Sequence, residues 1–178
     1  MSETRSLVLY PRHVFEAIRN KGRGDCGPAA LWQLIYGGWP STRDLKSMRN
    51  MAVDEVYSHS SRYIDFFDGE TETARRQSLY KWTTEMRQSG IWADQLFVNA
   101  IARAHMVNIR ILVPEEGNTL RDEQGNYAGQ GPARKTFFML HSGGSHFEAL
   151  KVLGEVKPIE RCVTTQEASE EMATEEEE

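Results

Sequence analysis

The chain has 178 residues, a formal net charge of −5 at pH 7 and a hydrophobic share of 39%. These values predict one soluble globular domain that buries a stable core, and no window is apolar enough for a membrane-spanning helix. Residues 163–178 hold seven glutamates and no basic residue. The rest of the chain is therefore nearly neutral, which argues against a nucleic acid or a membrane surface as partner.

Composition also predicts the domain boundary and the compartment. The segment 163–178 is acidic and poor in apolar residues, so we expect a folded domain over residues 1–162 and a disordered acidic tail after it. Cys26 and Cys162 are too few for a disulfide framework, and the N-terminus lacks the pattern of a secretory signal. We therefore expect a cytoplasmic protein, in the cytosol of a host cell if the source is a pathogen or a virus.

The first half of the chain is predicted to be helical. Residues 11–20 have the apolar spacing of a short amphipathic helix, and residues 28–36 form a compact apolar helix that ends at two glycines. Ser41 and Asp44 then have the spacing of a capping box, which indicates the start of another helix.

Two further helices precede a change of pattern. Residues 70–89 are strong helix formers with apolar side chains at steps of three and four, and Gly90 stands at the expected C-cap. Asp94 is predicted to be the N-cap of a helix whose core face includes Phe97 and which ends near His105.

The last part of the domain is predicted to form strands. The apolar period changes to two over residues 107–113, and residues 115–134 are rich in glycine and charge, as in a long loop. Residues 135–140 and 146–153 are expected to form a hairpin around the turn HSGGS. The sequence therefore predicts an α+β fold with a small, mainly antiparallel sheet packed between helices.

Cys26 lies at the start of the predicted helix over residues 28–36. Pro28 favours the first helical turn, so the thiol lies at a helix N-terminus, where backbone N–H groups stabilise the nucleophilic thiolate. Gly22 and Gly24 allow a loop whose N–H groups could face a developing oxyanion. A small buried cysteine that only fills space is the alternative that this stretch leaves open.

A nucleophilic cysteine needs a base, and the chain has five histidines. His146 opens a predicted strand, and Glu148 projects from the same face, so its carboxylate could orient the imidazole. A turn residue beside an exposed strand residue explains the same pair without catalysis. His141 flanks the same turn, and surface or capping roles are expected for His13, His59 and His105.

Three segments follow one another in the chain: GDCGPAALWQLI, GIWADQLFVNAIARAHMVNIRILV and SHFEAL. Taken together, in this order, they resemble the ovarian-tumour (OTU) family of cysteine proteases, most of which are deubiquitinases. The likeness spans roughly residues 20–153. Three positions depart from the family pattern. Arg23 stands where an aspartate is expected three places before the cysteine, Ala93 replaces a turn glycine, and Glu148 stands where asparagine or aspartate is more usual.

The resemblance implies a papain-like OTU fold and a thiol protease that hydrolyses isopeptide bonds at the C-terminus of ubiquitin. The catalytic and oxyanion-loop residues that it implies are Cys26, His146, Glu148, Asp25, Arg23 and Gly24. The implied partners are ubiquitin or polyubiquitin chains and, by extension, ubiquitin-like modifiers. We expect a monomer that uses no cofactor and no metal.

The implied substrate also suggests contact residues. Ubiquitin ends in two glycines, so the site would be a narrow channel, and Phe147 could form one wall. Trp92 is a second candidate, although packing between the late helices and the sheet is the simpler interpretation, with Asp94 as a helix cap. Residues 53–70 and 115–134 are candidates for a distal ubiquitin surface.

Two other functions stay open. The departures at Arg23, Ala93 and Glu148 fit a degenerate OTU-like module that binds ubiquitin without cleaving it. The order of cysteine then histidine on an α+β domain also fits another papain-like thiol enzyme, such as a processing protease or a transamidase. Covalent reaction of Cys26 with a ubiquitin electrophile would separate the first of these from a deubiquitinase.

Overall fold

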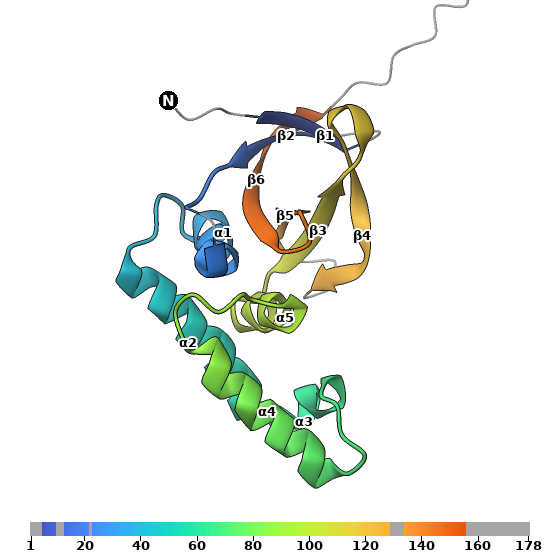
Figure 1. Cartoon of the computed structure of the whole chain (residues 1–178). Helices are drawn as coiled ribbons and strands as arrows, with labels where there is room; N and C mark the ends of the chain where they lie inside the picture. Colours follow the sequence, from blue (N-terminus) through green and yellow to red (C-terminus); the bar gives the residue numbers. More distant parts are fainter. Residues whose placement is uncertain (1–4, 10–12, 22, 129–133, 156–178) are drawn as a thin grey trace, which may run out of the picture.

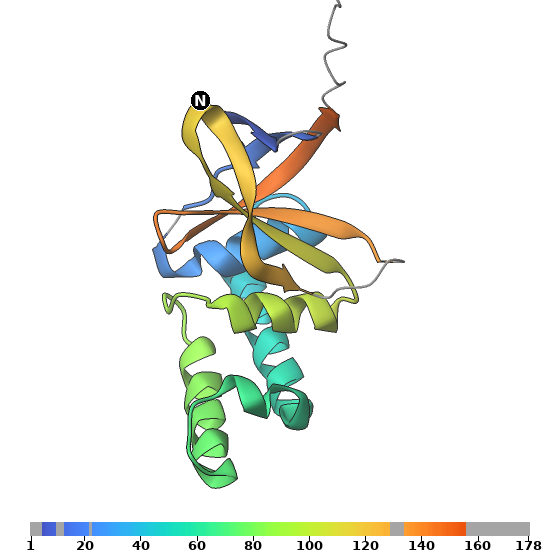
Figure 2. The same cartoon turned by 90° about the vertical axis from the view of Figure 1, so that its right-hand side faces the viewer.

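The computed structural model describes residues 5–9, 13–21, 23–128 and 134–155. The predicted acidic tail and Cys162 lie outside these residues. Within them no helix is both long enough and apolar enough to cross a membrane. Figure 1 shows a barrel of strands with the helices gathered on one side of it, and Figure 2 shows the same arrangement at right angles.

Six strands of the described chain close into a barrel. They are β1 (Arg5–Leu9), β2 (His13–Ile18), β3 (Asn108–Pro114), β4 (Thr119–Ala128), β5 (Thr136–Ser142) and β6 (His146–Glu155). Around the barrel the order is β1, β2, β6, β5, β3, β4. The pairs β1–β4 and β3–β5 are parallel and the others are antiparallel. The predicted α+β fold with a mainly antiparallel sheet is thus confirmed, and closure into a barrel is an addition to it.

The described residues also form five α-helices. They are α1 (Cys26–Ile35), α2 (Thr42–Ser58), α3 (Ser60–Tyr63), α4 (Glu72–Met86) and α5 (Gln95–Ala104). α1 packs against β6, and α5 packs against β3 and β4. α2 and α4 lie side by side and extend away from the barrel (Figure 1).

Side chains that alternate between the two faces of each strand contribute to two separate hydrophobic cores. The cluster that draws only on strands fills the barrel, and its buried members are Phe15, Ala17, Leu112, Leu120, Leu140 and Leu150. Strand residues of the opposite parity join the core of the helices, and they are Ile109, Ile111, Met139, Phe147 and Ala149. The helices therefore pack on the outer faces of β3, β5 and β6, because side chains alternate between the two faces of a strand.

Local capping signals predicted helix starts correctly. The Ser41 hydroxyl accepts from the Asp44 N–H at 3.1 Å, and the Asp44 carboxylate accepts from the Ser41 N–H at 2.8 Å, so a capping box opens α2. Asp94 likewise accepts from the Phe97 N–H at 2.9 Å and opens α5. The helix before Gly37 and the hairpin of β5 and β6 are confirmed as well.

Two segment predictions are wrong. Residues 11–20 do not form a helix, since His13–Ile18 is strand β2, paired with β1 and β6. Residues 115–134 are not one loop, since Thr119–Ala128 is strand β4, paired with β1 and β3. In both cases pairing with two other strands, one of them distant in sequence, decides the conformation. Residues 10–12 and 129–133 lie outside the described part of the chain.

Candidate active site

Cys26 is the first residue of α1 and lies against the β5–β6 hairpin. Its thiol donates to the Ser145 carbonyl at 3.5 Å, and the Phe147 N–H donates to the sulfur at 3.4 Å. The residue is only 3% exposed. The backbone on both sides of residue 146 therefore touches the sulfur, which brings together two positions 120 places apart in the chain.

His146 and Glu148 share one face of β6, as their spacing predicted. The imidazole Nε2 lies 3.7 Å from Glu148 Oε1, longer than a hydrogen bond but within the range of an ion pair. The Glu148 side chain is 16% exposed and that of His146 is 36% exposed. Among the hydrogen bonds between described residues, none joins the His146 imidazole to the Cys26 sulfur.

Asp25 precedes Cys26, but its carboxylate faces another part of the molecule. Its Oδ1 accepts from Arg49 Nη2 at 2.6 Å and from the Gly90 N–H at 3.0 Å, and its Oδ2 accepts from the Ser89 hydroxyl at 2.8 Å. Partial burial pushes the pKa of Asp25 upward, but the hydrogen bonds from Gly90, Arg49 and Ser89 outweigh it and hold that pKa below its usual value. Asp25 therefore serves the loop that carries the cysteine and does not contact the imidazole.

The loop before the cysteine is closely packed. Gly24 is buried, and a Cβ built on it would lie 1.7 Å from the Gly90 carbonyl oxygen. Arg23 is exposed and has a φ of 62°, a left-handed conformation that is uncommon for a residue with a side chain. The turn of residues 23–25 thus lies directly on the backbone of the α4–α5 connection.

The α4–α5 connection also touches the first turn of α1. A Cβ on Gly27 would lie 2.7 Å from the Cβ of Ala93, so Ala93 fills the space that Gly27 leaves. Asp94, the predicted cap, also accepts from the Trp82 indole at 2.7 Å. Trp92 does not pack between the late helices and the sheet, because it is 53% exposed. Its indole is therefore exposed beside this turn.

Phe147 and His141 face each other across β5 and β6 and form a stacked pair. Their ring centroids are 4.5 Å apart with planes 12° from parallel, and the His141 Nδ1 lies 2.9 Å from Glu123 Oε2. Phe147 is 5% exposed, so its ring lies in the core and does not form a channel wall as expected. The sequence did not predict the pair of His141 and Glu123. Glu123 lies in the segment predicted to be a loop, so no strand pairing placed it beside His141.

Asn20 is another contact that sequence reasoning missed. Its Nδ2 donates to the Phe147 carbonyl at 2.7 Å and to the Cys26 carbonyl at 3.4 Å. It therefore ties the end of β2 to both halves of the site. Of the other histidines, His59 and His105 are helix C-caps, as expected.

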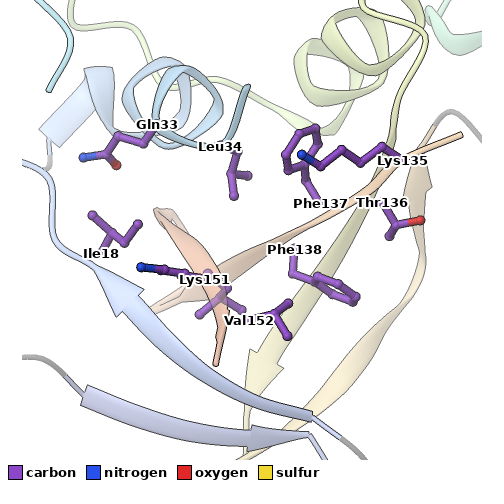
Figure 3. A pocket seen from close by; sticks show the side chains of 10 residues that line it. Ile18, Gln33, Leu34, Lys135, Thr136, Phe137, Phe138, Lys151 and Val152 are labelled. Atoms are coloured by element: carbon purple, nitrogen blue, oxygen red, sulfur yellow. The ribbon is translucent and has the colours of Figure 1, made fainter. Parts of the chain in front are cut away.

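A separate cavity of about 320 Å³ opens between the C-terminal half of α1 and strands β5 and β6 (Figure 3). Lys135, Lys151 and Phe138 line it, together with Gln33, whose Oε1 has no hydrogen-bond partner among the described residues. Its lining includes none of the site residues that the sequence predicted. The cavity is thus distinct from the cysteine site at the other end of α1.

Comparison with known proteins adds a family and a set of similar folds. The model of the OTU-like cysteine proteases matches residues 21–147, which is most of the chain. Among curated protein sequences no relative matches it. The match contains Cys26 and ends after His146, so it covers both halves of the site.

Several solved structures share the fold. The viral OTU domain protease from Farallon virus is 22% identical, with a TM-score of 0.65 over 84% of this chain and 91% of that chain. The Hazara virus OTU bound to ubiquitin is 19% identical, with a TM-score of 0.62 over 84% and 87%. The OTUD1 OTU domain is 16% identical, with a TM-score of 0.60 over 77% and 85%. At these identities the likeness shows the fold.

Proposed function

Because the chain belongs to the family of OTU-like cysteine proteases, we propose that it is a thiol-dependent deubiquitinase that hydrolyses isopeptide bonds at the C-terminus of ubiquitin. The Hazara virus domain, which has the same fold, is bound to ubiquitin. That neighbour supports ubiquitin or polyubiquitin as the partner of this chain, with ubiquitin-like modifiers as further substrates to test.

In the proposed mechanism Cys26 is the nucleophile and His146 is the general base and acid. The imidazole takes the thiol proton, and the sulfur bonds to the carbonyl carbon of the last ubiquitin glycine. His146 then gives the proton to the lysine amine as the C–N bond breaks. Water hydrolyses the thioester, which releases the ubiquitin carboxylate and restores the thiol.

Backbone N–H groups of the turn that leads into α1 would hold the oxyanion, since this turn and the helix N-terminus carry donors beside the sulfur. Glu148 would orient the imidazole after small rotations of both side chains, because catalytic contacts are often long before substrate binds. Trp92 would contact the substrate at the rim.

One observation carries the proposal: the sulfur of Cys26 is in contact with the backbone on both sides of His146. In the proposed reaction the His146 imidazole would come to the sulfur by side-chain rotation when substrate binds, because catalytic contacts are often long in the free enzyme. A cysteine that merely fills space has no need of a histidine at this position.

The test is a ubiquitin probe whose C-terminus carries a propargylamide electrophile. We expect one covalent adduct, located on Cys26 by peptide mass mapping and lost in Cys26→Ser. Cys162→Ser is the control and should react like the wild type. A folded protein that forms no adduct, or forms it on Cys162, would contradict the proposal.

The burial of Cys26 favours a second candidate, a ubiquitin-binding module without catalysis. In this case the closed contact with Ser145 and Phe147 would be permanent. Titration of labelled ubiquitin would then show binding without turnover of diubiquitin, and Cys26→Ser would bind equally well. Cleavage of any diubiquitin linkage by the wild type, lost in that variant, excludes this candidate.

A further inference from the structure

Arg49 is a charged side chain in the core of the protein. It lies on α2, on the same buried face as Met48 and Ala52, and its side chain is 1% exposed. A buried guanidinium destabilises a fold unless its charge is paired and its donors are hydrogen-bonded. Its partners therefore indicate why an arginine occupies this position.

All of those partners belong to the segments around the candidate nucleophile. Nε and Nη2 donate to Asp25 Oδ1 at 3.1 and 2.6 Å, and Nη2 also donates to the Gly24 carbonyl at 3.1 Å. Nη2 further reaches the Ile91 carbonyl at 2.6 Å, and Nη1 reaches the Met86 carbonyl at 3.0 Å. One guanidinium thus joins the turn before Cys26, the end of α4 and the α4–α5 connection.

Asp25 extends this hydrogen-bond network beyond Arg49. It accepts from the Ser89 hydroxyl and the Gly90 N–H, in the same connection that packs on Gly24. The contacts of the Cys26 sulfur, in contrast, are with the β5–β6 hairpin. The chain at residues 24–26 is therefore held by Arg49 of α2 and by the α4–α5 connection, and also, through the Cys26 sulfur, by the hairpin.

We propose that Arg49 is a positioning residue for the nucleophile. Through its bonds to Asp25 and to the Gly24 carbonyl, it fixes the peptide groups of residues 24–26. These peptide groups hold the oxyanion in the proposed function, and this inference rests on that function. The planar fork of arginine presents five donors in fixed directions, whereas lysine offers a compact charge with three. Lysine at this position therefore keeps the charge but cannot donate to the carboxylate and to all of the carbonyls at the same time.

The first test compares Arg49→Lys with Arg87→Lys. Arg87 also connects the end of α4 to α2, but it is exposed and its hydrogen bonds go to Asn50 and Asp54 instead of to residues 24–26. With a fluorogenic amide at the C-terminus of ubiquitin, we expect Arg49→Lys to lower kcat by about 100-fold while KM changes by less than about threefold. Arg87→Lys should match the wild type in both.

The second test does not depend on catalysis. We expect amide hydrogen exchange of residues 23–27, read by mass spectrometry, to be at least about tenfold faster in Arg49→Lys than in the wild type, with the exchange of the barrel strands unchanged. Equal exchange in the two proteins overturns the inference, whatever their activities. An Arg49→Lys variant that raises KM and leaves kcat unchanged also overturns it, because such a change reports lost binding common to substrate and transition state.

The two tests separate the two proposals. A wild type that leaves ubiquitin intact defeats the proposed function, while the exchange of residues 23–27 still decides the role of Arg49. If Arg49→Lys fails to fold, Asp25→Asn, which keeps the shape of the acceptor and removes its charge, replaces it under the same criteria.

Discussion

At the scale of single residues, Asp25 lies beside the candidate nucleophile, but its carboxylate is hydrogen-bonded away from the candidate base. Its oxygens accept from Arg49, Ser89 and Gly90. These bonds favour the ionised carboxylate and hold the pKa of Asp25 below its usual value, although partial burial acts in the opposite direction. The folded state therefore binds this proton less readily than the unfolded state does.

This difference predicts an acid dependence of stability. A carboxyl with a lowered pKa in the folded state stabilises the fold above its unfolded pKa of about 4, and this contribution is lost as the pH falls through the folded pKa. Between these two pKa values the unfolded state binds the extra proton, so acid favours unfolding. Urea unfolding followed from pH 7 downward should give a smaller loss below about pH 4 in Asp25→Asn than in the wild type.

The control for this prediction is Asp54→Asn. Asp54 pairs with Arg87 across the same two helices, but its side chain is 64% exposed. Exposed ion pairs contribute little to stability, so this variant should follow the wild type. Parallel curves for the wild type and Asp25→Asn would show that ionisation of Asp25 does not stabilise the fold.

At the scale of elements, the turn of residues 23–25 depends on close packing against the α4–α5 connection. A Cβ on Gly24 would lie 1.7 Å from the Gly90 carbonyl oxygen, a backbone atom that cannot move aside without displacing the chain. Gly24→Ala should therefore lower the free energy of unfolding by about 1–3 kcal/mol or more and abolish ubiquitin hydrolysis, since the oxyanion donors move with the turn.

Gly154→Ala is the matched control for this variant. A Cβ on Gly154 would meet nothing within 4 Å. Its unfolding midpoint in urea and its hydrolysis rate should equal those of the wild type. A Gly24→Ala protein that behaves in the same way would refute the packing argument.

The same scale shows which elements the sequence could predict. α2 and α5 begin at Ser41 and Asp94, where side chain and backbone a few residues apart bond to each other, so a local pattern was sufficient. β2 and β4 have no such local signal. Phe15 and Ala17 lie inside the barrel because β1 and β6 flank them. β1 is close to β2 in the chain, but β6 is distant, so a local window of sequence does not contain that second pairing.

At the scale of the whole molecule, the site is assembled from distant segments by the barrel and its helices. Cys26 and His146 could be singled out from the sequence because each belongs to a short motif at a helix or strand start. Arg49, Asn20 and Glu123 were not, since their roles depend on partners far away in the chain. For Arg49 the sequence held one signal: a charged residue on the otherwise apolar helix face that includes Met48 and Ala52.

The central claim is that His146 is the general base for Cys26 in the hydrolysis of ubiquitin conjugates. His141, which stacks on Phe147, is the alternative base. Both variants, His146→Asn and His141→Asn, can be compared on ubiquitin with a fluorogenic C-terminal amide, after circular dichroism has shown that they fold. We predict that His146→Asn lowers kcat/KM by at least about 100-fold and that His141→Asn lowers it by less than about tenfold. A larger loss in His141→Asn, or a folded wild type that does not hydrolyse the substrate, would contradict the claim.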